Sequence, residues 1–296
     1  MNDWMEWLNS GEYFTYKNLN VYYRVIGEGK PIFLIHGYPY NSYDWKDFIE
    51  YAKSNPLRQK IKWILLDLPG MGFSDKPKDH KYSFEEYADL ILFLSIHLKL
   101  QSIDILAHDL GASIAQELLA KLESEHIPLK INSIVFMNGG IFSDVYKPRW
   151  IQRILSQSPD WMGKYLSRNL SREKIENSIL SLFGPNTKIN KQKLNQYWEI
   201  LNYKEGKQIA YLLGRLVFQK PRYQTRWISA MNSTKIPLAY ICGPFDPNSG
   251  IHMAKKFETT IPKGKLYLLS DGIGHWPQIE APAEVWNALC NFLDLS

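Results

Sequence analysis

Residues 106–112, Leu-Ala-His-Asp-Leu-Gly-Ala, constrain the fold more than any other segment, because they read as a strand, a sharp turn at Asp109 and the start of a helix. A residue on such a turn has a strained backbone, and its neighbours two positions away must be small. Ala107 and Gly111 meet that condition. Aspartate also tolerates a positive φ angle better than most side chains do. An ordinary turn without chemistry is the alternative, since Asp and Gly are common turn residues.

Short β-rich segments alternate with helical patterns along the first half of the chain, as a sheet with crossover helices requires. We expect strands over residues 13–16, 21–25, 31–35, 63–66, 103–107 and 134–137. Residues 83–98 are expected to form a helix that Ser83 caps. Strands resume at residues 237–242 and 265–269, before a final helix over residues 283–292. All of these strands fit in a single sheet with helices packed on its faces, which is an α/β fold.

Residues 141–235 differ in character from the rest of the chain. Aromatic and basic residues are frequent there, Gly and Pro interrupt the helical periodicity, and convincing strands are lacking. We therefore expect a helical insertion at 141–235 in a core that comprises residues 1–140 and 236–296. Many of the chain's aromatic rings fall in the insertion, and we expect them to wall an apolar pocket.

Composition narrows the class of protein. The longest nearly apolar runs, residues 31–35 and 90–98, are far shorter than the roughly 18 residues of a transmembrane helix, so no integral membrane segment is expected. With only Cys242 and Cys290, and no secretory signal at the start, we expect a cytoplasmic protein without disulfides. The net charge of +5 arises from scattered Lys and Arg residues, which argues against nucleic-acid binding. The His and Cys residues lack metal-ligand spacing, so no metal site is predicted.

Backbone N–H groups near Asp109 form the next part of the predicted site. The strand at 31–35 runs into His36-Gly37-Tyr38-Pro39. A turn there can aim N–H groups at the same point as the N–H of Leu110, which would make an anion-stabilising pocket. We predict that the N–H groups of Tyr38 and Leu110 form this pocket.

Two further segments place an acid and a histidine after later strands. Asp246 follows the strand at 237–242, where a carboxylate can orient a histidine, and His275 lies on a glycine-rich loop after the last strand. Asp271 is a second candidate for the orienting acid, and the strand-end position favours Asp246. The order nucleophile, acid, histidine is the one expected of the α/β-hydrolase fold. We therefore predict a catalytic triad of Asp109, Asp246 and His275.

The chain resembles an α/β hydrolase with a helical lid, of the branch that holds epoxide hydrolases and haloalkane dehalogenases, and within that branch it most resembles the mesoderm-specific transcript family. The resemblance spans nearly the whole chain and is carried by Ser42-Tyr43-Asp44-Trp45, Gly72-Phe73-Ser74-Asp75-Lys76-Pro77, Ala115-Gln116-Glu117-Leu118-Leu119, Asn138-Gly139-Gly140-Ile141-Phe142, Gly243-Pro244-Phe245-Asp246-Pro247 and His275-Trp276-Pro277-Gln278. It implies the α/β-hydrolase fold, with a mostly parallel sheet flanked by helices and an inserted helical cap. Animal members of the family carry a hydrophobic leader that is missing here, so membrane residence is not carried over.

An aspartate nucleophile predicts the type of reaction. A carboxylate that attacks an electrophilic saturated carbon forms an alkyl ester, and water can then cleave that ester at the aspartyl carbonyl. His275 would be the base for that water, Asp246 would hold the imidazole, and the N–H groups of Tyr38 and Leu110 would stabilise the oxyanion. We predict a cofactor-independent hydrolase that acts on a small apolar substrate, an epoxide first of all.

Several hypotheses stay open beside this one. The resemblance implies that dehalogenases place Asn after His-Gly and Trp after the nucleophile, where this chain has Tyr38 and Leu110, so a haloalkane is the second choice. Epoxide hydrolases use lid tyrosines to protonate the epoxide oxygen, but we expect each lid tyrosine to be a packing residue: Tyr146, Tyr165, Tyr197, Tyr203, Tyr211 and Tyr223. The residues are also compatible with an esterase-like enzyme and with a ligand-binding or signalling module without turnover. The sequence does not fix the oligomeric state.

Some conspicuous residues are expected to have structural roles. Successive side chains of a strand point to opposite faces, so we expect the His108 side chain to point away from that of Asp109. We expect His36 to support a turn. Asp67 lies in a turn after a strand, where its side chain is expected to cap backbone amides. Trp4, Met5, Trp7 and Leu8 form an apolar face at helical spacing, which we expect to dock onto the body.

Overall fold

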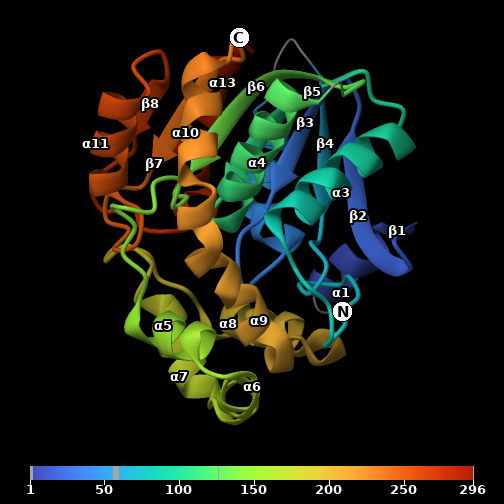
Figure 1. The fold of residues 1–296 in the computed structure, drawn as a ribbon, viewed down its shortest axis with the longest axis vertical. Coiled ribbons are helices and arrows are strands. Elements are labelled where there is room, and N and C mark those ends of the chain that lie inside the picture. Colours follow the sequence, from blue (N-terminus) through green and yellow to red (C-terminus); the bar gives the residue numbers. More distant parts are fainter. Residues whose placement is uncertain (1–2, 56–59, 126, 296) are drawn as a thin grey trace.

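A computed structural model describes residues 3–55, 60–125 and 127–295 of the chain, and an eight-stranded sheet forms its centre (Figure 1). The strands are β1 (Glu12–Tyr16), β2 (Leu19–Gly27), β3 (Lys30–Ile35), β4 (Ile61–Leu66), β5 (Ser102–His108), β6 (Lys130–Met137), β7 (Leu238–Cys242) and β8 (Lys265–Leu268). They lie in the order β1-β2-β4-β3-β5-β6-β7-β8. The pairs β1–β2 and β2–β4 are antiparallel and the other five are parallel, which confirms the predicted mostly parallel sheet.

Helices cover both faces of this sheet, which explains why its central strands are continuously apolar. One face packs against α3 (Phe84–His97), α4 (Leu110–Ser124), α10 (Gln224–Ser233) and α11 (Ile251–Thr260), and the other against α1 (Asp3–Asn9), α2 (Lys46–Ser54) and α13 (Pro282–Leu293). The predicted cap of α3 is confirmed, because the Ser83 side chain accepts a hydrogen bond from the N–H of Glu86. Along β5, every residue from Ile103 to His108 is buried.

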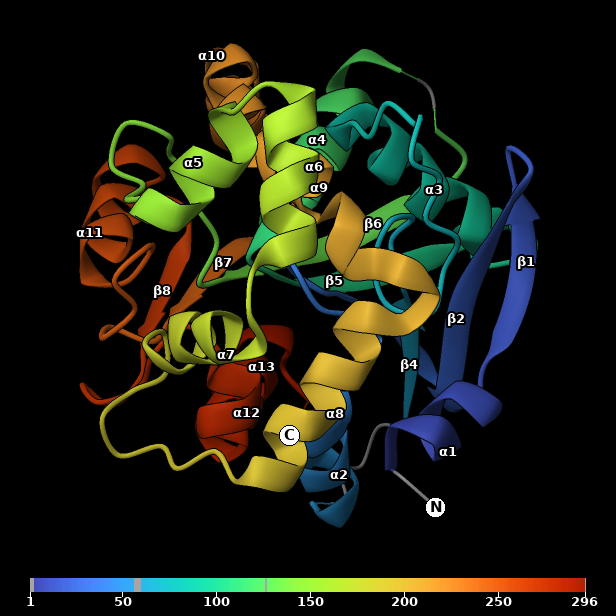
Figure 2. The ribbon, with the colours of Figure 1, turned by 90° about the horizontal axis from the view of Figure 1, so that it is seen from below.

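Five helices of the segment between β6 and β7 gather beyond one end of the sheet (Figures 1 and 2). They are α5 (Trp150–Gln157), α6 (Asp160–Asn169), α7 (Arg172–Leu180), α8 (Lys191–Asn202) and α9 (Gly206–Gln219). The last helix of the segment, α10, instead packs along α4 of the core. Short helices complete the chain: η1 (Ser42–Trp45), η2 (Tyr203–Glu205), η3 (Lys220–Arg222) and α12 (Pro277–Glu280).

The first helix docks onto the molecule as predicted, but the prediction that Met5 belongs to its docking face is wrong. Trp4 and Trp7 of α1 are buried, whereas Met5 on its other side is 40% exposed. The Trp4 ring contacts Phe73 of the core and Tyr203 of η2, so α1 bridges the core and the segment that contains η2.

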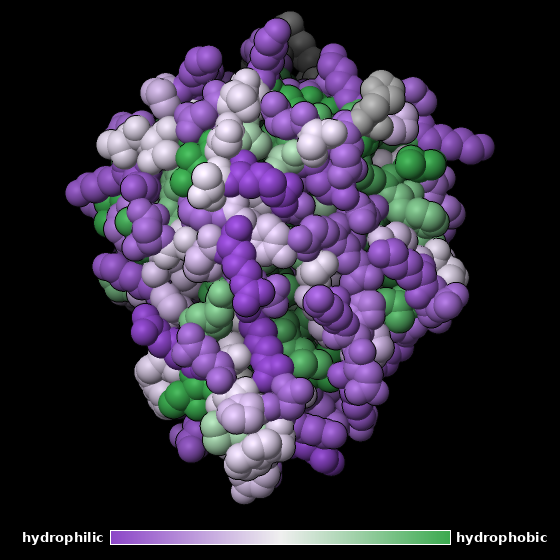
Figure 3. Space-filling model, in the orientation of Figure 1, coloured by the Kyte–Doolittle hydropathy of each residue, from purple (hydrophilic) through white to green (hydrophobic). Residues whose placement is uncertain are grey.

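Hydrophilic residues predominate on the face seen in Figure 3, with hydrophobic residues interspersed among them. Within the part of the chain that the structure describes, the helices are all too short or too polar to cross a bilayer.

Candidate active site

Asp109 occupies the predicted turn between β5 and α4. Its φ angle of 49° and ψ angle of −111° lie outside the regions that ordinary residues adopt, a strain that costs about 1–3 kcal/mol and concentrates at functional sites. The turn is also tightly packed. A Cβ atom added to Gly111 would lie 2.6 Å from the carbonyl oxygen of Ile35, and one added to Gly37 would lie 2.5 Å from the Cβ of Asp109. The glycines therefore let the end of β3 lie directly against the Asp109 side chain and the first turn of α4.

The carboxylate of Asp109 lies between a backbone donor and the imidazole of His275. The N–H of Tyr38 donates to Asp109 Oδ2 at 3.0 Å. On the other side, His275 Nε2 is 3.9 Å from Asp109 Oδ1, which is a longer separation than a hydrogen bond. Leu110 is the first residue of α4, where N–H groups lack intrahelical partners. The structure thus brings Tyr38, Leu110 and His275 around Asp109.

A second carboxylate, Asp246, holds the opposite edge of the His275 ring. The Nδ1 of His275 lies 2.8 Å from Asp246 Oδ2, and both side chains are buried. Burial lowers the pKa of His275, but the charge and hydrogen bond of Asp246, with a further contribution from Asp109, outweigh it and raise the pKa to about 9. The pKa of Asp246 is held well below its usual range, because its interactions with His275 outweigh the effect of burial.

Three residues that the sequence analysis did not assign saturate the Asp246 carboxylate. Asn138 Nδ2 and Ser249 Oγ donate to Oδ2 at 3.0 and 2.7 Å, and the N–H of Asn248 donates to Oδ1 at 2.8 Å. Asn138 lies at the end of β6, in one of the segments that carry the family resemblance, which is the only sequence signal for it. The other candidate acid, Asp271, is exposed.

Two further side chains fix the loop that carries His275. His108 Nε2 donates to the carbonyl oxygen of His275 at 2.7 Å, and the Nδ1 of the same ring accepts from Gln278 Nε2 at 3.3 Å. Burial, reinforced by the nearby His275, lowers the pKa of His108 to about 4, so its ring is neutral as these contacts require. Glu280 accepts hydrogen bonds from the N–H groups of Gly274 and Trp276, both at 3.1 Å.

His36 and Asp67 have the structural roles that the sequence predicts. His36 Nε2 accepts from the N–H of Leu68 at 3.0 Å, which fixes two strand ends relative to each other. Asp67 accepts from the N–H groups of Ser42 and Phe73 at 2.8 and 2.7 Å, so it caps backbone amides.

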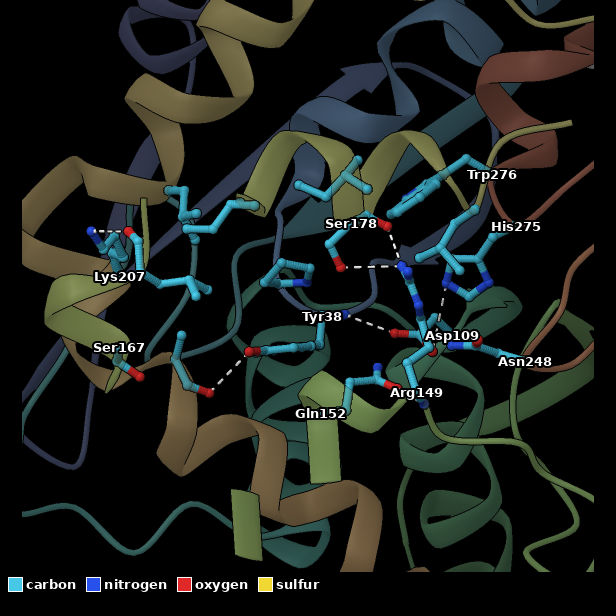
Figure 4. Close-up of a pocket in the computed structure, with 17 residues that line it drawn as sticks. Tyr38, Asp109, Arg149, Gln152, Ser167, Ser178, Lys207, Asn248, His275 and Trp276 are labelled. Carbon is cyan, nitrogen blue, oxygen red and sulfur yellow. Dashed lines mark hydrogen bonds and ion pairs between the residues drawn. The ribbon is translucent and has the colours of Figure 1, made fainter. Parts of the chain in front are cut away.

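A cavity of about 110 Å³ opens beside Asp109 and His275, and residues of the 141–235 segment form most of its lining (Figure 4). Its lining residues are Tyr38, Pro39, Asp109, Arg149, Gln152, Ser167, Leu170, Ile175, Ser178, Ile179, Leu182, Leu201, Lys207, Ala210, Asn248, His275 and Trp276. An engineered cavity of about 150 Å³ admits benzene, so this cavity suits a small molecule.

The aromatic wall that we expected from the insertion is not found in this cavity. The aromatic lining residues are Tyr38 and Trp276, both outside 141–235, and none of the six insertion tyrosines is among the lining residues. Tyr165 is 63% exposed, so it is not the packing residue that we expected. Other tyrosines of the segment contact protein neighbours; for example, the Tyr197 ring lies 4.5 Å from that of Tyr40 and the Tyr223 ring lies 5.1 Å from that of Trp227. The 141–235 segment contributes aliphatic and polar side chains to the lining, because several of its rings pack against residues outside the segment instead. Arg149 and Lys207, which the sequence did not single out, are cations of the lining.

Within the described ranges, no group of three or more His, Cys, Asp or Glu side chains is arranged to hold a metal ion.

Comparisons with known proteins agree with this architecture. Residues 30–282 match the family of the alpha/beta hydrolase fold. The mesoderm-specific transcript homolog protein of Bos taurus is 33% identical over 296 residues, which cover 97% of this chain and 87% of the relative. Among solved structures, the epoxide hydrolase CorEH aligns with a TM-score of 0.76 at 17% identity, over 96% of this chain and 98% of the other. The haloalkane dehalogenase DatA from Agrobacterium tumefaciens aligns with a TM-score of 0.77 at 18% identity, over 96% of both chains. The chain therefore belongs to the alpha/beta hydrolase fold family and, within it, to the family of the mesoderm-specific transcript proteins.

Proposed function

We propose that this protein is a hydrolase in which Asp109 attacks an electrophilic saturated carbon and forms an alkyl ester, with an epoxide as the first substrate class. One observation carries the proposal: an aspartate occupies the strained turn, with a backbone N–H on one oxygen and the Nε2 of a histidine facing the other. Residues 141–235, in this proposal, act as a cap that encloses the substrate over the carboxyl ends of the strands.

In the first step, an Asp109 oxygen bonds to a ring carbon of the epoxide and the carbon–oxygen bond of the ring breaks. The opened oxygen takes up a proton from solvent and remains on the product as a hydroxyl group, and the imidazolium of His275 releases a proton to solvent before the second step. In the second step, His275 removes a proton from water, and the resulting hydroxide attacks the carbonyl carbon of the ester. The N–H groups of Tyr38 and Leu110 would stabilise the oxyanion until the diol leaves and the Asp109 carboxylate is restored.

The charge of Asp109 couples these two steps. In the resting enzyme it helps to raise the pKa of His275 to about 9, so the imidazole is protonated at pH 7. Formation of the ester removes that negative charge, while burial still lowers the pKa. The imidazole of the ester intermediate therefore loses its proton more readily, and only the neutral imidazole can accept a proton from water.

Two features favour an epoxide over an alkyl halide. Tyr38 and Leu110 stand where dehalogenases carry side-chain donors for a halide, and Leu110 has no such donor. The Tyr38 hydroxyl donates to the carbonyl oxygen of Ala210 at 3.1 Å, so it is already engaged. When an epoxide opens, the oxygen of the broken carbon–oxygen bond stays attached to the product. An epoxide therefore needs no separate site for a leaving group, whereas an alkyl halide needs a site for the halide ion.

The test is to trap the ester in a His275→Gln variant. This variant is incubated with a panel of small epoxides and haloalkanes, and the tryptic peptide 100–121 is then analysed by mass spectrometry. We expect an adduct on Asp109, placed by fragmentation because the peptide also contains Asp104. His97→Gln, which changes an exposed histidine at the end of α3, away from the site, should turn substrate over without accumulating an adduct. An unmodified peptide across the whole panel would contradict the proposal.

A further inference from the structure

Two cations line the cavity, and their charge is not balanced within it. Arg149 and Lys207 are lining residues, and Asp109 is the one acidic residue among the described lining residues. His275, protonated at pH 7 in the resting enzyme, compensates Asp246. The Asp109 charge can therefore offset one of the two cations, and one positive charge is left in the cavity.

Arg149 differs in its contacts from the other arginines of the same segment. Arg172, Arg215 and Arg226 each form an ion pair with a carboxylate, and the remaining three, Arg153, Arg168 and Arg222, are exposed to solvent, whereas Arg149 is half-buried. Arg149 donates from Nη1 to the carbonyl and hydroxyl oxygens of Ser178, and within the described residues it has no carboxylate partner (Figure 4). Its Nε and Nη2 have no hydrogen-bond acceptor in that part of the chain.

An arginine in this setting calls for an anion. Burial lowers the pKa of Arg149, which reflects the cost of removing the guanidinium from water. A half-buried charge without a partner is destabilising unless a ligand supplies the opposite charge. The planar guanidinium fork matches a carboxylate, which it can bind through two parallel hydrogen bonds.

The position of Arg149 indicates which end of a substrate it would meet. A second, outer groove is lined by Arg149, Trp150, Ile154, Leu166, Leu170, Lys174, Asn177 and Ser178. It shares Arg149, Leu170 and Ser178 with the inner cavity, so Arg149 stands at the boundary between them. A substrate whose reacting carbon lies at Asp109 would therefore meet Arg149 with its other end, the end that faces the outer groove.

We infer that Arg149 binds a carboxylate of the substrate, so the substrate class is a small epoxy acid rather than a wholly apolar epoxide. The aliphatic lining residues Ile179, Leu182 and Leu201 would contact its hydrocarbon part. This inference rests on the proposed function for the reacting group, but the recognition of the carboxylate is tested without any reaction.

The test compares two unreactive probes of the same shape, butanoate and butanamide, by calorimetric titration of the full-length protein. We expect butanoate to bind about 10- to 100-fold more tightly, because a charge-assisted hydrogen bond is stronger than a neutral one. Arg149→Gln should abolish this preference, and Arg149→Lys should restore part of it, since lysine keeps the charge but loses the fork. Arg153→Gln is the matched control, because it removes the same charge from an exposed position of α5, the helix that Arg149 precedes, and the preference should stay unchanged.

Equal binding of the two probes to the wild-type protein, or an unchanged preference in Arg149→Gln, would overturn the inference. A second measurement follows adduct formation on Asp109 in the His275→Gln background with 2,3-epoxybutanoate and 2,3-epoxybutanamide. Arg149→Gln should slow only the reaction of the acid; equal slowing of both would mean that Arg149 acts on the opening oxygen instead. A butanoate preference without any adduct would leave the recognition of the carboxylate standing while the proposed function fails.

Discussion

The two carboxylates beside His275 have different environments, and this difference suits the different roles that we propose for them. Asp246 accepts four hydrogen bonds, from His275, Asn138, Asn248 and Ser249, and lies fully enclosed. Asp109 accepts one from the N–H of Tyr38 and lines the cavity. An oxygen saturated with donors is a poor nucleophile and a good orienting group, which supports our proposal that Asp109 attacks the substrate and that Asp246 holds the imidazole.

Asp246→Asn should therefore lower the rate of ester breakdown by about 10⁴-fold, because the amide no longer stabilises the imidazolium or fixes the tautomer. The rate of this step in the wild-type enzyme should rise with pH, because the neutral imidazole is the base, and its midpoint should lie below the resting value of about 9. Loss of the Asp246 charge should move the midpoint lower still. Rapid-quench measurements of the ester across pH test both effects.

Asp271→Asn serves as the matched control for this prediction. The residue is the exposed acid nearest to His275 in the sequence, and its replacement should leave the pH profile unchanged. A large effect of Asp271→Asn together with a small effect of Asp246→Asn would reverse the assignment of the orienting acid.

At the level of elements, the site consists of loops at the carboxyl ends of parallel strands, and Glu280 fixes the loop after β8. Glu280 accepts from the N–H groups of Gly274 and Trp276 and, across to the 141–235 segment, from the N–H of Gly184 at 2.7 Å and the hydroxyl of Thr187 at 2.9 Å. The carboxylate thus joins the His275 loop to that segment.

Glu280→Ala should lower the free energy of unfolding by about 3 kcal/mol, the upper value for one hydrogen bond to a charged group, because four donors lose their acceptor but are only partly buried and can bond to water instead. Turnover should fall as well, since the loop that positions His275 loosens. Glu258→Ala on the exposed face of α11 should change the free energy of unfolding by no more than about 0.5 kcal/mol. Urea denaturation of both variants measures the difference, and equal stability would contradict this role of Glu280.

The core elements were predictable because each leaves a local signal. The continuous apolar run of β5, the Ser83 cap and the Asp–Leu–Gly turn reflect interactions between residues close in sequence. Asp109, Asp246 and His275 each follow a strand, and parallel strands bring their ends together. The sequence analysis assigned no role to three other residues, because their contacts join segments far apart in the chain: Asn138, Glu280 and Arg149.

At the scale of the whole molecule, the cavity lies between the sheet with its flanking helices and the helices of residues 141–235. The core supplies Asp109, His275 and Trp276, and the 141–235 segment supplies the aliphatic side chains and both cations of the lining. The sequence alone could not predict this lining, because the orientation of each inserted helix depends on its contacts with the core. In our account, the core determines the reaction and the inserted segment determines the substrate.

The most direct test of the central claim is a single turnover in heavy-oxygen water, with an epoxide that forms an adduct in the His275→Gln variant. If Asp109 forms an ester, water attacks the aspartyl carbonyl, and the product leaves with an oxygen that came from the enzyme. We predict an unlabelled diol and one heavy oxygen in the peptide 100–121, at Asp109. A labelled diol together with an unlabelled peptide would mean that His275 activates water for direct attack on the substrate, and would contradict the account.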